Sequence, residues 1–152
     1  MLRDRITEAL KTAMKAKDSS GLATVRLMQA ALKDRDIAAR SNGNHDGITD
    51  DEILSLLQSM IKQRRDSIEM YEKGGRPELA EKEASEIKVI ESFLPEQMDE
   101  AAVSEAIEGV IKELGAASMK DMGRVMGTLK ERHAGEMDFG KASGEVKARL
   151  AG

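Results

Sequence analysis

The chain has 152 residues, with 28 Asp and Glu against 24 Lys and Arg, a net charge of −4 and no cysteine. The lack of cysteine excludes a disulfide scaffold, a thiolate zinc site and a cysteine nucleophile, and the acidic balance argues against a protein that coats nucleic acid indiscriminately. Two prolines, two phenylalanines and one tyrosine, among abundant Ala, Leu, Met, Glu and Lys, are typical of helices, so we predict an all-α fold.

The composition also bears on the compartment. No apolar run approaches the roughly 18 residues that a membrane-spanning helix needs, so we expect no membrane partner. The opening Met1-Leu2-Arg3-Asp4-Arg5 is not followed by the apolar core of a signal peptide. We therefore predict a cytoplasmic protein.

The first two predicted helices cover residues 2–17 and 22–40. The cluster Asp18-Ser19-Ser20-Gly21 ends the first, and Ser41-Asn42-Gly43-Asn44 stops the second. Residues 1–40 hold nine Lys or Arg against five Asp or Glu, which favours a basic side of the molecule. Ordinary solvated helix faces with i,i+4 ion pairs explain the same count.

The third predicted helix opens with Thr49-Asp50-Asp51-Glu52, a capping box, and runs to residue 73 before Gly74-Gly75. Arg64 projects near the middle of its apolar stripe. Two interpretations are open. Arg64 snorkels to the surface or pairs with an acid from the next helix, or it joins Arg65 and Arg26 in a groove as a donor for phosphate or carboxylate.

The fourth predicted helix starts at Pro77 and ends at residue 94, because Pro95 follows. Three further helices are predicted over residues 99–114, 118–133 and 138–150. We therefore predict a four-helix N-terminal domain over residues 1–95 and a smaller three-helix bundle over residues 96–152. The second is small for an independent core.

No set of residues in the sequence indicates catalysis. The two histidines, His45 and His133, lie far apart in the chain and outside any metalloprotease motif. A calcium loop starting at Asn42 fails because its twelfth position is Ile53 rather than glutamate. We predict no catalytic residue, no metal site and no cofactor.

The segment 118–133 separates into two faces on a helical wheel. Five apolar residues and a histidine share one arc, namely Met119, Met122, Val125, Met126, Leu129 and His133. Gly123 and Gly127 fall on the other side, flanked by Lys120, Arg124 and Lys130. Because each glycine inside a helix costs about 1 kcal/mol relative to alanine, an exposed pair needs a reason, and the close approach of another backbone supplies one. The binding partner that approaches here is an RNA strand or a protein helix.

Five short stretches resemble motifs of the GatB/YqeY family, and their order and spacing extend the match over nearly the whole chain. They are Ala13-Met14-Lys15, Arg26-Leu27-Met28, Lys62-Gln63-Arg64-Arg65-Asp66-Ser67 with Tyr71, Phe93-Leu94-Pro95-Glu96-Gln97, and Lys120-Asp121-Met122-Gly123-Arg124-Val125-Met126. The last is similar to the family's "kdmGkvM" signature. Residues 135–141 depart from the pattern, which usually has a polar, Asp-led approach to the final helix.

The resemblance implies a module related to the tail of the B subunit of glutamine-dependent tRNA amidotransferases. It implies an association with carbon–nitrogen ligase chemistry that uses glutamine as amido donor, although the residues for that chemistry lie in parts of those enzymes absent here. We expect no activity of this chain alone and a non-catalytic tRNA contact. The alternative is an adaptor that docks on an aminoacyl-tRNA synthetase or amidotransferase subunit through its Met-rich tail. The predicted RNA- or partner-binding residues are Arg26, Lys62, Arg64, Arg65, Lys120, Gly123, Arg124, Gly127 and Lys130.

Overall fold

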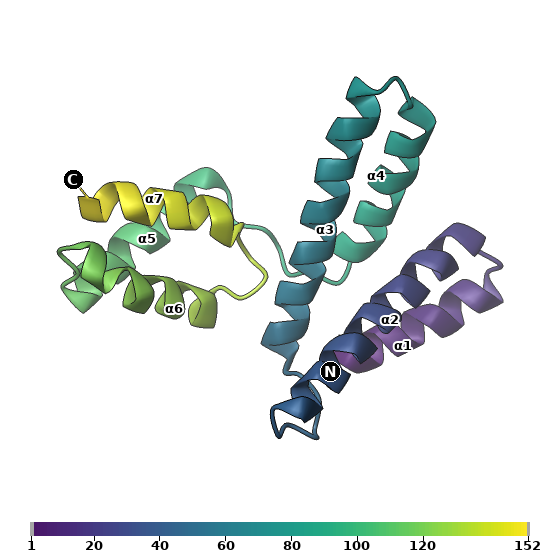
Figure 1. Cartoon of the computed structure of the whole chain (residues 1–152), viewed down its shortest axis with the longest axis horizontal. Coiled ribbons are helices and arrows are strands. Elements are labelled where there is room, and N and C mark those ends of the chain that lie inside the picture. The colour runs from purple at the N-terminus through teal and green to yellow at the C-terminus, as the bar shows by residue number, and fades with distance from the viewer. Residues whose placement is uncertain (1, 152) are drawn as a thin grey trace. The chain divides into compact units, whose positions relative to one another are not determined.

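The computed structural model describes residues 2–151, which form helices and no strand (Figure 1). The elements are α1 (Leu2–Lys15), α2 (Ser19–Ser41), α3 (Asp50–Lys73), α4 (Pro77–Glu91), α5 (Glu100–Leu114), the short 3-10 helix η1 (Met119–Asp121), α6 (Met122–Arg132) and α7 (Phe139–Ala151). The prediction of an all-α fold is confirmed. Within the described residues, no helix is long and apolar enough to cross a membrane.

Contacts within the chain divide it into two compact units, Met1–Leu94 and Pro95–Gly152. In the first unit, α1 packs along α2 and α3 packs along α4, as two helical hairpins (Figure 1). Its core combines α1 to α4 and includes side chains that are 0–1% exposed. These include Ile6, Met28, Ile53, Leu57 and Ile90. The core thus joins residues far apart in the sequence.

The start of α3 follows the local signal in the sequence. The Thr49 hydroxyl accepts a hydrogen bond from the Glu52 amide at 3.2 Å, and the Glu52 carboxylate accepts one from the Thr49 amide at 3.1 Å. This reciprocal pair satisfies two backbone donors that the helix cannot pair internally. The predicted capping box is confirmed.

The break between α1 and α2 differs from the prediction. Lys17 takes a left-handed conformation with φ 54°, and α2 already begins at Ser19 rather than at residue 22. The reason is Asp18, whose carboxylate accepts from the Gly21 amide at 3.0 Å and caps the new helix. The polar cluster is therefore the start of the second helix as well as the end of the first.

The second unit has its own core, formed by α5, α6 and α7 around Ile107, Val125, Leu129 and Val146, all 0% exposed. Asp99 caps α5 by accepting from the Ala102 amide at 2.7 Å. Gly115 ends α5 in the left-handed conformation, φ 63°, which glycine adopts without strain. These local signals place the ends of α5 where the sequence predicts them.

The predicted continuous helix over residues 118–133 is wrong in its first turn. The chain instead forms η1 and then α6, because the Asp121 carboxylate accepts from the amides of Ala117 (3.0 Å) and Ser118 (3.3 Å). A side chain that bonds back to the chain before it tightens the start of the helix. Lys120 and Met119 therefore lie on η1, ahead of the regular α6 register.

Candidate functional site

The outward face of η1 and α6 carries the five residues that we call the α6 strip. They are Lys120, Gly123, Arg124, Gly127 and Lys130, and every one of them is exposed. The opposite face explains this orientation. Val125 and Leu129 are 0% exposed, and Met122 and Met126 pack against the same core. Burial of the apolar face turns the basic face outward.

The two glycines of the strip face open space. A methyl group added at Gly123 or at Gly127 would meet no atom within 4 Å, apart from the helix's own backbone and chain neighbours. The glycines are therefore not needed for packing inside the second unit. They leave two shallow places between cations, where another molecule can approach the helix backbone.

We expect the double replacement Gly123→Ala with Gly127→Ala to stabilise the second unit by about 1–2 kcal/mol, because alanine is the better helix former and meets no obstacle. Thermal unfolding followed by circular dichroism at 222 nm measures this effect. A lower melting temperature would show that the glycine backbone is needed for the fold. The matched control is Gly115→Ala, which is expected to destabilise because φ there is 63°.

The cations of the strip differ in their partners. Arg124 donates from Nη2 to Asp121 Oδ1 at 2.8 Å, yet its side chain is still 57% exposed. Hydrogen bonds from the Ala117 amide, Arg124 and the Ser118 amide lower the pKa of Asp121. Lys120 and Lys130 make no ion pair with any residue between 2 and 151. The strip therefore presents two free ammonium groups and one partly engaged guanidinium.

Arg64 of α3 makes the ion pair that one of the two interpretations predicted. Its Nε donates to Glu86 of α4 at 2.8 Å and lies 3.9 Å from Glu83. Nη1 donates to the Met60 carbonyl at 3.2 Å, and the side chain is only 13% exposed. The guanidinium therefore joins α3 to α4, and its Nε and Nη1 already donate to acceptors within the first unit.

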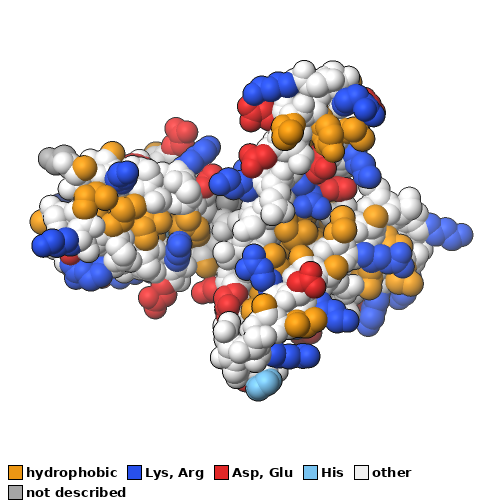
Figure 2. All heavy atoms as spheres, viewed as in Figure 1, with side chains coloured by type: hydrophobic (Ala, Val, Ile, Leu, Met, Phe, Trp, Pro, Cys, Tyr) orange, Lys and Arg blue, Asp and Glu red, His pale blue; other side chains and the backbone are white. Residues whose placement is uncertain are grey.

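The other predicted residues of the first unit lie on the surface. Lys62 and Arg65 are exposed on α3, and Arg65 pairs with Glu91 of α4 at 3.4 Å. Arg26 is exposed on α2 and has no hydrogen-bond or ion-pair partner in the described part of the chain. Figure 2 shows Lys and Arg side chains gathered over α1 and α2. Arg64 is thus engaged within the first unit, whereas Arg26 and Lys62 are exposed on its surface.

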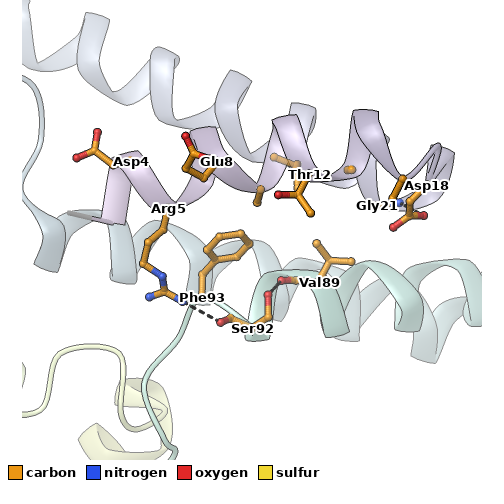
Figure 3. Close-up of a pocket in the computed structure, with 13 residues that line it drawn as sticks. Asp4, Arg5, Glu8, Thr12, Asp18, Gly21, Val89, Ser92 and Phe93 are labelled. Carbon is orange, nitrogen blue, oxygen red and sulfur yellow. Dashed lines mark hydrogen bonds between the residues drawn. The ribbon is translucent and has the colours of Figure 1, made fainter.

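Sequence reasoning missed an apolar trough in the first unit, with a volume of about 630 Å³. Its walls are α1 and the end of α4, and Val25 and Gly21 of α2 contribute to the lining (Figure 3). At one end, the Arg5 guanidinium lies 5.6 Å from the centre of the Phe93 ring and donates to the Ser92 carbonyl at 3.2 Å. Small residues at helical spacing, Ala9 and Ala13 on α1 and Ala16 just after it, are the only signal of this trough in the sequence.

Metal binding finds no support in the geometry. Over residues 2–151, no group of three or more His, Asp or Glu side chains lies in a position to hold a metal ion. His133 instead lies 3.0 Å from Glu136, with Nδ1 facing the carboxylate. The α6 strip is a surface of exposed cations with open space at Gly123 and Gly127.

Comparison with known proteins identifies relatives in fungi. The chain is 32% identical over 120 residues to "Altered inheritance of mitochondria protein 41, mitochondrial" of Vanderwaltozyma polyspora, covering 74% of this chain and 62% of that protein. The protein of the same name from Pyrenophora tritici-repentis is 32% identical over 135 residues, covering 84% and 71%. That from Lachancea thermotolerans is 33% identical over 107 residues, covering 69% and 55%. The chain thus spans less than two thirds of the length of the relatives from Vanderwaltozyma polyspora and Lachancea thermotolerans.

These names correct the predicted location. The relatives are named as mitochondrial proteins, so the prediction of a cytoplasmic location is wrong. That prediction relied on the default left after a signal peptide and a membrane helix had been excluded. A helical protein inside a mitochondrion needs the same buried and exposed residue types as one outside it, so composition cannot separate the two compartments.

The family model described as "Yqey-like protein" matches residues 3–150, nearly the whole chain. The matched region includes nearly all of both units and the complete α6 strip. The resemblance that the sequence motifs indicated is thereby confirmed, including the relation of this family to the tail region of the amidotransferase B subunit. The chain belongs to the Yqey-like protein family.

Proposed function

We propose that this chain is a non-catalytic module that contacts tRNA through the α6 strip. The observation that carries the proposal is the outward, side-chain-poor and cationic face of η1 and α6, where Gly123 and Gly127 border open space. Lys120 and Lys130 supply charge for phosphates, and the glycines allow the sugar–phosphate backbone to come close.

A double-stranded region of tRNA fits this surface better than a single strand. Double-stranded RNA is recognised by shape, through phosphates and 2′-hydroxyls across its shallow minor groove. Single-stranded RNA is bound by stacking on exposed aromatic rings. Here Phe93 is only 6% exposed, and Tyr71 and Phe139 are both half-buried. With a net charge of −4, the contact must be local.

The proposal assigns the tRNA contact to a C-terminal three-helix domain, residues 96–152, that follows a four-helix domain, residues 1–95. Its support is the separate core of each region and the relation to the amidotransferase tail. Carbon–nitrogen ligase chemistry with glutamine as amido donor belongs, in this proposal, to the larger enzymes. The chain contributes binding, not bond formation.

The adaptor alternative requires methionines that are free to meet a synthetase or amidotransferase subunit. Met119 is 42% exposed on η1. Met122 and Met126, however, already pack against the core of the second unit. One exposed methionine is a small apolar anchor, so the structure favours the RNA contact over the adaptor.

The test compares two variants that each remove two positive charges from the second unit. Lys120→Ala with Lys130→Ala removes the free cations of the strip and leaves the Arg124–Asp121 pair intact. Lys112→Ala with Lys147→Ala, exposed on α5 and α7, is the matched control. Filter binding to purified tRNA over a series of salt concentrations gives the affinity and its salt slope.

We expect wild-type protein to retain tRNA at low salt and to lose it steeply as salt rises. Loss of two phosphate contacts should lower the logarithmic salt slope by about 1.8, whereas the control should keep the wild-type slope. If wild-type protein does not retain tRNA at low salt, the proposed function is wrong. If both variants bind as wild type does, the strip is not the contact.

A further inference from the structure

A second row of cations lies on the first unit, along the outward side of α2. We call Arg26, Lys33 and Arg40 the α2 row. They follow one another at intervals of seven residues, so they lie on one face, about 10 Å apart along the helix axis. All three are exposed. The helix thus presents a straight line of positive charge about 21 Å long.

The row borders one acid of α2, Asp36, which stands three residues after Lys33 and four before Arg40. On a helical wheel, the arc of about 120° that contains the row holds only apolar, small or uncharged polar residues besides the three cations. These are Gln29, Leu22, Ser19, Ile37, Ala30, Ala23 and Ser41. Arg26, Lys33 and Arg40 make no ion pair within the described residues 2–151. Their charges are therefore available to another molecule.

The carboxylate of Asp36 is already engaged by residues outside α2. Asp36 accepts from Nη1 of Arg3 at 2.6 Å, from Nη2 of Arg3 at 3.0 Å and from the Ile48 amide at 2.9 Å. The hydrogen bond from Arg3 is the main reason why the pKa of Asp36 is lowered. Asp36 makes no salt bridge with Lys33 or Arg40, because its carboxylate is held by α1 and by the loop before α3, although the charge of Arg40 is a further, smaller reason why its pKa is lowered.

A small pocket of about 270 Å³ lies beside the row, between α1 and α2. Buried Ile6 and Leu32 contribute apolar atoms to its lining, and its wall holds Lys33 and Arg40 together with the paired Arg3 and Asp36. The cations therefore stand beside a hollow, where an anionic group can approach two of them from one side.

We propose that the α2 row binds the phosphate backbone of RNA, as a second contact on the first unit. This inference rests on the proposed function, and it adds a second cationic surface that binds the same RNA phosphates. A line of unpaired cations at regular intervals complements a polyanion whose charges also recur regularly. Such a row positions the RNA and does not read its sequence.

An anionic membrane is the weaker match for this face. A helix that lies on a membrane inserts its apolar side into the lipid. The apolar side of α2 is already buried in the core of the first unit, where Val25, Met28 and Leu32 are 0–7% exposed. The face with the row carries alanine and serine beside its cations, with Ile37 as its one large exposed apolar side chain.

The test uses the full chain. Each cation is replaced by glutamine, which removes the charge and keeps a similar helix propensity. The triple variant Arg26→Gln, Lys33→Gln, Arg40→Gln is compared with Lys15→Gln, Lys82→Gln, Lys88→Gln. The control residues are exposed on α1 and α4, and they too lack an ion-pair partner in the part of the chain that is described. Both variants lose three positive charges. Circular dichroism confirms that both are folded before purified tRNA is titrated over a salt series.

Loss of the α2 row should lower the logarithmic salt slope of tRNA binding by about 2.7, whereas the control should keep the wild-type slope. Raising salt from 50 to 200 mM should therefore weaken tRNA binding by a factor that is about 40 times smaller in the row variant than in wild type. Equal slopes in the row variant and its control would overturn the inference. Binding of phosphatidylserine vesicles that depends on the row, with tRNA binding unaffected, would overturn it too.

The α6 strip variant, measured in the same assay, separates the two proposals. If the strip variant loses tRNA binding and the row variant keeps it, the proposed function stands and the second contact is wrong. If wild-type protein does not bind tRNA, both are wrong. If each variant lowers the slope and a combined variant lowers it by the sum, both contacts are supported.

Discussion

Replacing Leu129 by alanine should destabilise the second unit by about 3–5 kcal/mol. The side chain is 0% exposed in the core formed by α5, α6 and α7, and removal of a buried leucine leaves a cavity that its neighbours fill only in part. The free energy of unfolding of so small a unit is low, so we expect its amides to lose hydrogen-exchange protection in this variant. Exchange measured by nuclear magnetic resonance on the full chain reports each unit separately.

The control for this experiment is Leu27→Ala on α2, which makes the same chemical change at a side chain that is 49% exposed. It should alter stability by no more than about 0.5 kcal/mol. Amides of the first core, such as those of Met28 and Leu57, should keep their protection in Leu129→Ala. Equal loss of protection in both units would contradict the separate cores that the two clusters indicate.

Replacing Arg64 by methionine should destabilise the first unit by about 2–4 kcal/mol. The change leaves Glu86, whose side chain is 14% exposed, and Glu83, at 22%, without the guanidinium that lies between them and α3. A carboxylate that is mostly buried and has lost its partner costs more than the pair contributes. Urea unfolding of the variant, followed by circular dichroism, measures the effect.

The neighbouring arginine is a natural control for this change. Arg65 pairs with Glu91 at 3.4 Å, but both side chains are well exposed, at 62% and 46%, so Arg65→Met should cost less than about 1 kcal/mol. Adding Glu86→Met to Arg64→Met should restore much of the loss, because the more buried of the two orphaned charges is gone. If Arg64→Met unfolds at the wild-type urea concentration, the pair does not stabilise the unit.

The sequence predicts the elements of this fold well because their signals are local. Thr49 and Glu52 are three residues apart, and Asp99 and Ala102 likewise, so the caps of α3 and α5 are visible without any tertiary contact. The apolar arc of α6 similarly predicts which side of that helix is buried. Val125 and Leu129 prove fully buried, and Gly123 and Gly127 face outward.

The remaining features depend on contacts between residues far apart. Arg64 meets Glu86 across 22 positions, and the pattern around Arg64 alone leaves the groove interpretation open. The trough between α1 and α4 requires Phe93 to meet Arg5, which no local pattern indicates. The start of α6 was missed because Asp121 serves both as a helix residue and as an acceptor for the amides before it.

The contact between Arg5 and the end of α4 bears on how the protein forms during synthesis. The hydrogen bond from Arg5 to the Ser92 carbonyl spans 87 positions, while α1 with α2 and α3 with α4 are neighbours in the chain. A nascent chain can therefore form each hairpin soon after it leaves the ribosome, but it cannot clamp α1 to α4 until Phe93 has emerged. Until then, α1 is covered at most by α2 and α3, and its small residues Ala9 and Ala13 lack the neighbours Val89 and Phe93.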